Sequence, residues 1–348
     1  TTGSNNVAVG LNALDANTTA SNNTAVGYTA LSANTTGTSN TAMGYNSLTS
    51  NTTASNNTSI GYASLEAITT GGDNTALGYR AGDSLTTGNN NAIVGRSALS
   101  SDTLGDRAVA IGSGALATQN FTSSTDNYNV GIGFNAGALI TTGVSNTLIG
   151  GLAGDSLTDA DFNVALGYFA LGGDTKGNKT TAIGVGALES QNFTSPTDTY
   201  NTALGYQAGK LVTTGTLNTL IGGLAGDAIT TATDNTAVGY AALTATTTGA
   251  ENTAVGSLAL ATNTTGASNT AFGRASLNAN TTASYNTAYG TDTLQVNTTG
   301  ANNTATGYRA LFVNTTGAQN TASGVRALGG NTTGGDNTAM GYEALRLN

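Results

Sequence analysis

Apolar residues come in short groups that end in glycine, as in Thr24-Ala25-Val26-Gly27, and Leu31 follows that glycine four residues later. The group occurs twenty times; seventeen of the nineteen spacings between its glycines are 17 residues and two are 21. We call these residues the anchor glycines and number positions relative to them. They are Gly10, Gly27, Gly44, Gly61, Gly78, Gly95, Gly112, Gly133, Gly150, Gly167, Gly184, Gly205, Gly222, Gly239, Gly256, Gly273, Gly290, Gly307, Gly324 and Gly341. A fixed period of one unit predicts a solenoid, in which each repeat covers the hydrophobic face of the next.

The apolar group itself predicts a short strand. Positions −3 to −1 often hold a β-branched residue, a small residue and a larger aliphatic residue, as in Val164-Ala165-Leu166, and this pattern favours a strand bounded by glycine. A 17-residue unit with an invariant glycine is too short for a pair of helices and their turns. We therefore predict an all-β fold, a parallel β-solenoid (β-roll) of about twenty 17-residue coils that spans residues 1–348 as one domain.

Both faces of this strand are restricted in composition. Position −2 is alanine in fifteen repeats, and position −1 is apolar in most of them. A strand with one solvated face accepts charged residues there, so the restriction predicts that both faces are covered. One face would line the coil, and the other would contact a partner.

Two further positions indicate what fills the interior. Position −4 is asparagine in eighteen repeats, with Ala108 and Thr180 as the exceptions, which indicates either a ladder of stacked amides or a simple turn preference. Position +4 is leucine except in five repeats that carry glycine, and those five have an apolar residue at +7, such as Leu85 after Gly82. Positions +4 and +7 are therefore predicted to fill the same interior space, because an empty slot would cost about 2–5 kcal/mol.

The two longer repeats carry nearly identical insertions at residues 119–129 and 191–201. Each contains a phenylalanine and a tyrosine within a polar stretch: Phe121 and Tyr128 in the first, Phe193 and Tyr200 in the second. Aromatic side chains on polar loops suit the faces of sugar rings, and they equally suit lateral packing between chains. These four residues are the candidate ligand or lateral-contact positions.

Composition narrows the possible functions. The net charge is −9, and the ten Lys and Arg residues are scattered singly, which disfavours a nucleic-acid partner. No apolar run approaches the roughly 18 residues needed to cross a bilayer, so we expect no membrane insertion by this segment. The chain contains neither Cys nor His, and we therefore expect no metal site and no cofactor.

Two stretches resemble the nucleophile motif of GDSL hydrolases, Gly82-Asp83-Ser84-Leu85 and Gly154-Asp155-Ser156-Leu157. A Ser-His-Asp relay needs a histidine base, and this chain has none. Both copies also lie in phase with the repeat, which favours a structural role. We predict that the protein is not an enzyme and has no catalytic residues.

The repeat resembles one known family. Asn-Thr-Ala-Val-Gly, and above all Ala108-Val109-Ala110-Ile111-Gly112, is similar to the repeat in the YadA-type heads of trimeric autotransporter adhesins and to repeats of phage tail-fibre-like proteins. The resemblance covers five or six residues of each coil. It implies a left-handed parallel β-roll that associates as three chains, with positions −3 and −1 pointing inward. The period of 17 differs from about 14 in that family, and threonine often replaces valine at position −3.

These observations favour a non-enzymatic structural fibre or adhesin rod that is extracellular, at a cell surface or in a virion fibre. Two alternatives stay open. One is a carbohydrate-binding, phage tail-fibre-like shaft, in which the aromatic loops would bind surface glycans. The other is an ice-binding β-solenoid, which would use threonine rows, although Thr35 and Thr36 are adjacent rather than separated by one residue.

The expected partner is the chain itself. Restricted composition on both strand faces predicts a parallel homotrimer. The termini also fall in phase, since Thr1 occupies position +8 and Asn348 position +7. The repeat would thus continue without a seam into a second copy, which predicts either a head-to-tail filament or an excerpt of a longer fibre.

Overall fold

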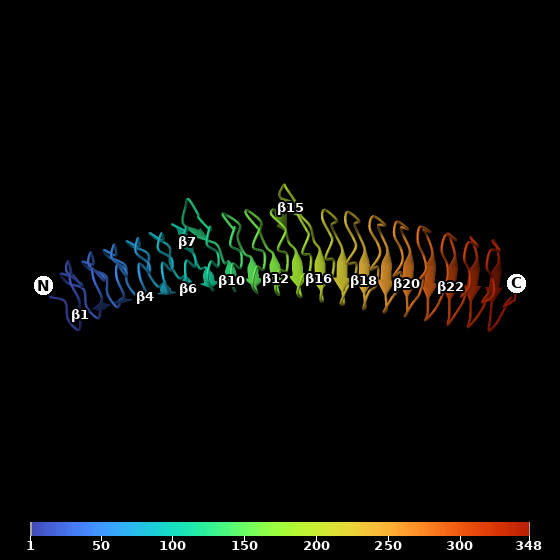
Figure 1. The fold of residues 1–348 in the computed structure, drawn as a ribbon, viewed down its shortest axis with the longest axis horizontal. Coiled ribbons are helices and arrows are strands. Elements are labelled where there is room, and N and C mark those ends of the chain that lie inside the picture. The colour runs from blue at the N-terminus through green and yellow to red at the C-terminus, as the bar shows by residue number, and fades with distance from the viewer. Residues whose placement is uncertain (1, 348) are drawn as a thin grey trace. The chain divides into compact units, whose positions relative to one another are not determined.

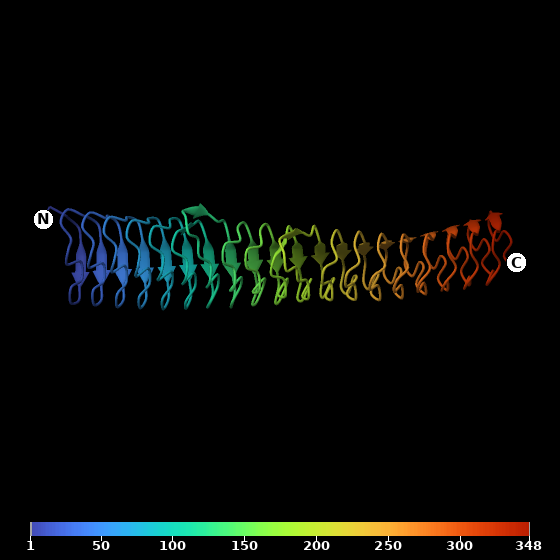
Figure 2. The same ribbon diagram turned by 90° about the horizontal axis from the view of Figure 1, so that it is seen from above.

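The computed structural model describes residues 2–347 and contains strands, turns and irregular segments, with no helix in that range. Contacts group the chain into two compact units, Thr1–Asn178 with Thr194–Pro196, and Lys179–Phe193 with Thr197–Asn348. Within each unit, successive coils stack in chain order (Figures 1 and 2). The expectation of a seamless junction concerns Thr1 and Asn348, which lie outside the described residues.

Each unit holds ten three-residue strands of a parallel sheet. In the first unit they are β1 (Val7–Val9), β2 (Thr24–Val26), β3 (Thr41–Met43), β4 (Thr58–Ile60), β5 (Thr75–Leu77), β6 (Ala92–Val94), β8 (Val109–Ile111), β10 (Val130–Ile132), β11 (Thr147–Ile149) and β12 (Val164–Leu166). In the second they are β14 (Thr181–Ile183), β16 (Thr202–Leu204), β17 (Thr219–Ile221), β18 (Thr236–Val238), β19 (Thr253–Val255), β20 (Thr270–Phe272), β21 (Thr287–Tyr289), β22 (Thr304–Thr306), β23 (Thr321–Ser323) and β24 (Thr338–Met340).

Equivalent positions of neighbouring coils pair in register. Strand β2 pairs with β3 through Thr24 and Thr41, Ala25 and Ala42, and Val26 and Met43. Strands β18 and β19 pair in the same way in the second unit. Four two-residue strands lie outside this pattern, β7 (Gly105–Asp106), β9 (Thr125–Asp126), β13 (Gly177–Asn178) and β15 (Thr197–Asp198). The prediction of an all-β, parallel β-solenoid with about twenty coils is confirmed.

The anchor glycine ends each strand with a backbone conformation that side chains disfavour. At Gly44, φ is +139°, and a Cβ atom there would lie 2.3 Å from the carbonyl oxygen of Gly61, the anchor of the next coil. Backbones of successive anchors thus touch directly, and only glycine fits both the angle and the space. This contact explains why the anchor does not vary.

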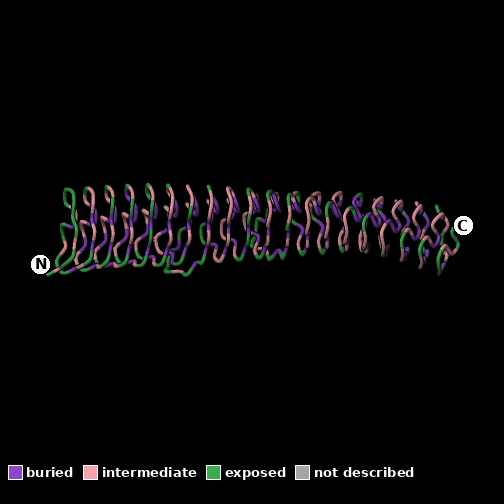
Figure 3. Tube along the Cα trace, turned by 90° about the horizontal axis from the view of Figure 1, so that it is seen from below, coloured by how far each residue is buried: buried purple, intermediate pink, exposed green. Residues whose placement is uncertain are grey.

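The strand residue that points inward is at position −2, not at the two positions beside it. In every three-residue strand from β2 onward the middle residue is buried while its neighbours are half-buried or exposed, as Ala25 shows between Thr24 and Val26. The inward placement of positions −3 and −1 implied by the resemblance is therefore wrong for this chain. The physical reason is a narrow interior, in which alanine leaves room for leucine at position +4. Buried and exposed stretches accordingly alternate around each coil (Figure 3).

The predicted exchange between positions +4 and +7 is confirmed. Leu31 and Leu48 at +4 are fully buried, and where Gly82 replaces leucine, Leu85 at +7 is fully buried instead. A second compensation comes from position −2. A Cβ atom on Gly82 would lie 2.7 Å from Cδ1 of Ile93, so the larger residue in the next coil occupies the space. Leu148 and Leu220 fill the space beside the other four glycines at +4.

Position +4 also carries backbone strain. Leu31 and Leu48 adopt φ values of 55° and 52°, in the left-handed region that non-glycine residues seldom adopt. Gly82 has φ of 60° at the same position and is free of that strain. Leucine is tolerated there because its side chain is wholly buried, whereas the glycine repeats leave the burial to neighbouring positions.

Asparagine at position −4 forms a ladder of stacked amides, and a simple turn preference does not explain its repetition. The buried side chain of Asn40 accepts a hydrogen bond from the backbone N–H of Asn57 at 2.9 Å and donates to the carbonyl of Ala54 at 2.8 Å. The same arrangement recurs in the second unit, where Oδ1 of Asn252 accepts from the N–H of Asn269 at 3.0 Å. Each amide therefore gives the buried N–H of the next coil an acceptor and also donates to a buried backbone carbonyl.

Position +7 forms a second interior ladder in the repeats that have asparagine there. Nδ2 of Asn314 donates to Oδ1 of Asn297 at 2.8 Å, and Nδ2 of Asn331 donates in turn to Oδ1 of Asn314 at 2.9 Å. These asparagines are buried. Position +7 is thus filled by a polar amide in some coils and by an aliphatic side chain in others.

Among residues 2–347 the structure has no helix with the length and hydropathy that crossing a bilayer requires.

Candidate functional site

The two insertions separate their aromatic residues into a buried one and an exposed one. Phe121 and Phe193 are buried, with 5% and 7% of their surface exposed, whereas Tyr128 and Tyr200 are 54% and 52% exposed. The phenyl rings therefore belong to the packing beneath each loop. Only the two tyrosines present an aromatic ring to a ligand or to another chain.

Each exposed tyrosine lies in a small charged cluster. At the first insertion, Arg107 from the preceding coil forms an ion pair with Asp126, and its guanidinium lies 5.7 Å from the centre of the Tyr128 ring. The Tyr128 hydroxyl lies 3.4 Å from both the Arg107 guanidinium and the Asp126 carboxylate. Cation, carboxylate and phenol thus hold one another in place on the surface.

The second insertion repeats this cluster with lysine in place of arginine. Lys179 pairs with Asp198, and its ammonium lies 5.2 Å from the centre of the Tyr200 ring and 3.2 Å from the Tyr200 hydroxyl. Hydrogen bonds to Asp198 and then to Tyr200 raise the pKa of Lys179 above its ordinary value. The same geometry therefore arises twice from residues that the sequence places at equivalent positions.

The first insertion also repairs a gap in the amide ladder. Ala108 replaces asparagine at position −4, so the backbone N–H of Asn129 in the next coil lacks its usual acceptor. Asn127 from the insertion supplies one, because its Oδ1 accepts from that N–H at 2.9 Å. In the second insertion, the hydroxyl of Thr199 accepts from the N–H of Asn201 at 3.2 Å. The two exceptions to the asparagine pattern thus occur where an insertion provides the substitute.

A buried carboxylate anchors the base of the first insertion. Asp102, at position +7, accepts from Nε2 of Gln119 at 2.6 Å and from the backbone N–H groups of Gly105 at 3.1 Å and Phe121 at 3.3 Å. Burial raises the pKa of Asp102 above its ordinary value, although these hydrogen bonds oppose the change.

This shift predicts a pH dependence of stability. Because the folded-state pKa of Asp102 is above the unfolded value of about 3.9, the folded chain binds more protons between the two values, and its stability falls as pH rises through that window. The effect is about 1.4 kcal/mol for every unit of pKa. Denaturant unfolding from pH 3 to 8 should show this slope, and Asp102→Asn should remove it.

Asparagine is a suitable replacement because Asn51 occupies the same position and accepts from the N–H of Ala54 at 3.1 Å. Asp336→Asn, which removes an exposed carboxylate, controls for the change in net charge. An unchanged slope in Asp102→Asn would contradict the assignment to this carboxylate.

A row of stacked tyrosines forms an exposed surface in the first unit. Tyr28, Tyr45, Tyr62 and Tyr79 lie at position +1 of four consecutive coils, with ring centres 5.1 to 5.2 Å apart and planes within 11° of parallel. Each is between 44% and 48% exposed. Since neighbouring rings cover one another's faces, the row presents ring edges and hydroxyl groups rather than a flat platform. The sequence indicates this row of tyrosines, because a tyrosine directly follows each of four successive anchor glycines.

The outward face of the sheet carries exposed apolar residues at position −1. In the first unit, Met43, Ile60 and Leu77 are 41%, 36% and 46% exposed. In the second unit Phe272 and Tyr289 at the same position are exposed and stack with ring centres 4.7 Å apart. The composition of both strand faces is restricted in the sequence. In the structure, the face that the chain itself leaves uncovered carries positions −3 and −1.

The GDSL-like stretches lie in the repeat as ordinary coil segments. Leu85 and Leu157 fill the core, and Asp83 forms an ion pair with Arg80 at 2.7 Å. With no histidine in the sequence, neither serine has the base that the hydrolase relay requires. Residues 2–347 contain no group of three or more acidic side chains placed to hold a metal ion.

Comparisons of the chain with protein-family models, with curated proteins and with solved structures find no match, so the function is inferred from its own residues.

Proposed function

We propose that this chain is a non-enzymatic structural segment of an extracellular fibre or adhesin, at a cell surface or in a virion, and that it associates with further copies of itself as a parallel homotrimer. The observation that carries the proposal is the outward sheet face, where Met43, Ile60 and Leu77 present aliphatic side chains on successive coils. Repeated apolar exposure on a regular surface is typical of an interface. Repeats on one chain would meet the same repeats on another, which a symmetric oligomer requires.

The resemblance to YadA-type adhesin heads supports the same association, since those heads combine three chains. Association of chains through the outward face would also shield the backbone of each thin coil from water. The repeat itself supports a structural role, because its least variable residues, such as Gly44 and Asn40, contact neighbouring coils. Head-to-tail stacking of copies would lengthen such an assembly into a filament.

The outward face can be tested by adding charge to it. The double variant Ile60→Lys and Leu77→Lys should reduce the trimer to monomers without loss of fold, because these side chains are exposed within one chain and would meet like charges between chains. Thr36→Lys with Thr53→Lys, at exposed positions on another part of the coil, is the matched control. Sedimentation velocity measures both. Equal assembly of the two double variants would refute this interface.

A carbohydrate-binding shaft is the second candidate, and the twin clusters around Tyr128 and Tyr200 favour it. Each combines an exposed ring with a carboxylate and a cation, and such groups can contact the apolar face and the hydroxyl groups of a sugar. Ice binding receives less support. The Thr35 hydroxyl donates to the carbonyl of Thr52 at 3.0 Å, and the exposed threonines do not form paired rows on one strand.

The glycan proposal requires variants of the tyrosines. Tyr128→Ala combined with Tyr200→Ala should abolish binding on a glycan array while unfolding is unaffected, since both rings are exposed. Phe121→Ala is unsuitable because its buried ring supports the loop. Tyr285→Ala, at an exposed tyrosine outside the insertions, is the control. Glycan binding that survives the double substitution would exclude these loops as the site.

A further inference from the structure

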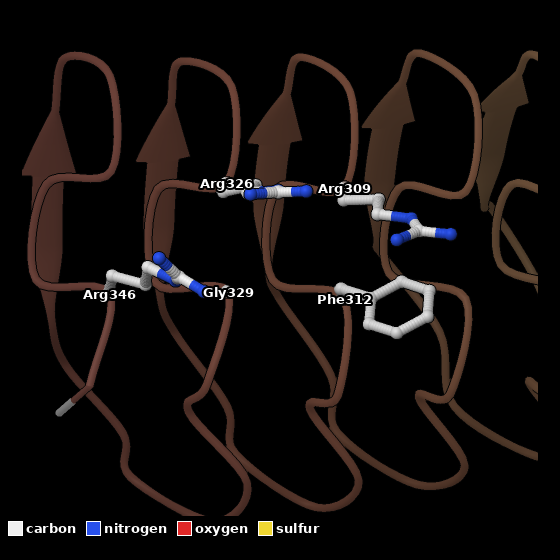
Figure 4. A pocket seen from close by; sticks show the side chains of 5 residues that line it. All are labelled: Arg309, Phe312, Arg326, Gly329 and Arg346. Carbon is white, nitrogen blue, oxygen red and sulfur yellow. The ribbon is translucent and has the colours of Figure 1, made fainter.

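A pocket in the second unit lies where one side chain of a regular row is missing. Position +5 carries Phe312 in one coil, Gly329 in the next and Arg346 in the third. Because Gly329 has no side chain, a gap opens between the coil that carries Phe312 and the side chain of Arg346, which extends toward Gly329 (Figure 4). Together with Arg309 and Arg326 at position +2, these residues line a pocket of about 120 Å³ (Figure 4).

The pocket concentrates positive charge in a chain whose net charge is −9. Asp292 pairs with both Arg274 at 2.9 Å and Arg309 at 3.4 Å. Glu343 pairs with both Arg326 at 3.3 Å and Arg346 at 3.1 Å. Three guanidinium groups line the pocket, and the two carboxylates that pair with them are Glu343 and Asp292, of which Asp292 is shared with Arg274 outside the pocket. The pocket therefore carries a local excess of positive charge.

The acidic partners hold the arginines in place without using all their donors. Each guanidinium has five N–H groups in a fixed fork, and the contacts to Glu343 occupy only part of those on Arg326 and Arg346. Desolvation opposes the ionised form of Glu343, but hydrogen bonds from Arg326 and Arg346 and the charges of both hold its pKa below its ordinary value. Glu343 therefore stays ionised at neutral pH and continues to orient both arginines.

One wall of the pocket is apolar and aromatic. The Arg309 guanidinium lies 4.8 Å from the centre of the Phe312 ring and 5.1 Å from that of Tyr308. Stacking of this kind fixes a guanidinium plane beside a ring. A ligand in the pocket would meet the N–H donors of the arginines and, beside them, the Phe312 ring.

We propose that this pocket binds a small organic acid in which one carboxylate is attached to a six-membered ring. The carboxylate would accept hydrogen bonds from Arg326 and Arg346, and the ring would lie against Phe312. A carboxylate matches the planar guanidinium fork, whereas a polyanion would be repelled by the acidic remainder of the chain. The ring can belong to an acidic sugar or to an aromatic acid, since both present an apolar face.

Ligand-observed NMR titration of the full chain tests the site with glucuronate and benzoate as probes. Binding of either probe supports the proposal, and the tighter one identifies the source of the ring. Glucose and inorganic sulfate are the neutral and ringless controls. Binding of sulfate alone, or of no probe at millimolar concentrations, would overturn the proposal.

Three variants test the residues. Arg326→Gln should weaken carboxylate binding about tenfold or more, because it removes one charge-assisted fork. Arg326→Lys keeps the charge but loses the fork, so its affinity should be intermediate. Gly329→Gln removes no arginine and fills the gap with the residue that Gln295 supplies two coils earlier, and it should abolish binding.

Arg80→Gln is the matched control, since Arg80 is an exposed arginine paired with an acidic residue in the first unit. Its affinity should equal that of the unaltered chain. If Gly329→Gln binds both probes as tightly as the unaltered chain, the gap is not the site. The proposal is independent of the fibre function, because chain mass and carboxylate affinity are measured separately.

Discussion

Replacing Gly150 with alanine is expected to unfold the coil that contains it, whereas the same substitution at the adjacent Gly151 should be nearly neutral. At Gly150, φ is +135°, and an added Cβ would lie 2.5 Å from the carbonyl oxygen of Gly167. At Gly151 the nearest atom would be Cδ2 of Tyr168 at 3.6 Å, which is an ordinary contact. Backbone strain alone costs about 1–3 kcal/mol, and the clash between two backbones adds to it.

Gly150→Ala should therefore lower the free energy of unfolding by about 3 kcal/mol or more, and Gly151→Ala should change it by less than about 0.5 kcal/mol. Urea unfolding measures the total effect. Because coils of a solenoid open locally, hydrogen exchange should show lost protection around β11 and β12. The duplicated pair Gly222 and Gly223 offers the same comparison in the second unit. Equal stability of the two alanine variants would refute the anchor role.

Replacing Asn252 with alanine should have the second large effect. Its Oδ1 accepts from the backbone N–H of Asn269 at 3.0 Å, and its Nδ2 donates to the carbonyl of Gly266 at 2.9 Å. Alanine leaves the buried N–H of Asn269 without this acceptor, which costs about 1–3 kcal/mol, whereas the carbonyl of Gly266 keeps a second donor, Nδ2 of Asn263 at 2.9 Å. The expected loss of unfolding free energy is therefore about 1–3 kcal/mol.

The control for the ladder is Thr265→Ala, which alters an exposed side chain in the coil between the two asparagines. It should leave the urea midpoint unchanged within about 0.5 kcal/mol. Relative to the unaltered chain, the hydrogen-exchange rate in Asn252→Ala should increase most at the backbone amide of Asn269, which loses its acceptor. If that amide keeps its protection, the ladder does not hold the coils together in the way proposed.

The period, the strand positions and the compensation between Gly82 and Leu85 could be predicted from the sequence because each is a repeated local pattern. The inward face could not, because alanine at position −2 and valine at position −1 are both compatible with a core. Only packing against Leu31 and its equivalents decides between them. The left-handed conformation of that leucine likewise leaves no signal in its residue type.

The length and aromatic content of the two insertions identify them as candidate loops in the sequence. The structure then shows that their aromatic residues differ in burial. Phe121 and Tyr128 look alike in sequence, yet the first lies under the loop and the second on it. Asn127 provides an acceptor because Ala108 lacks an amide side chain. This relation between the two residues follows from the stacking of the coils and not from the sequence. The pocket at Gly329 arises in the same way, because its lining residues come from three successive coils.

The most direct test of the proposed function is the mass of the protein in solution, measured by light scattering at micromolar concentration. The account predicts three times the chain mass of 34.2 kDa, or a multiple of that trimer if copies also stack end to end. A mass of one chain at every concentration up to the millimolar range, with the fold intact by circular dichroism, would contradict it.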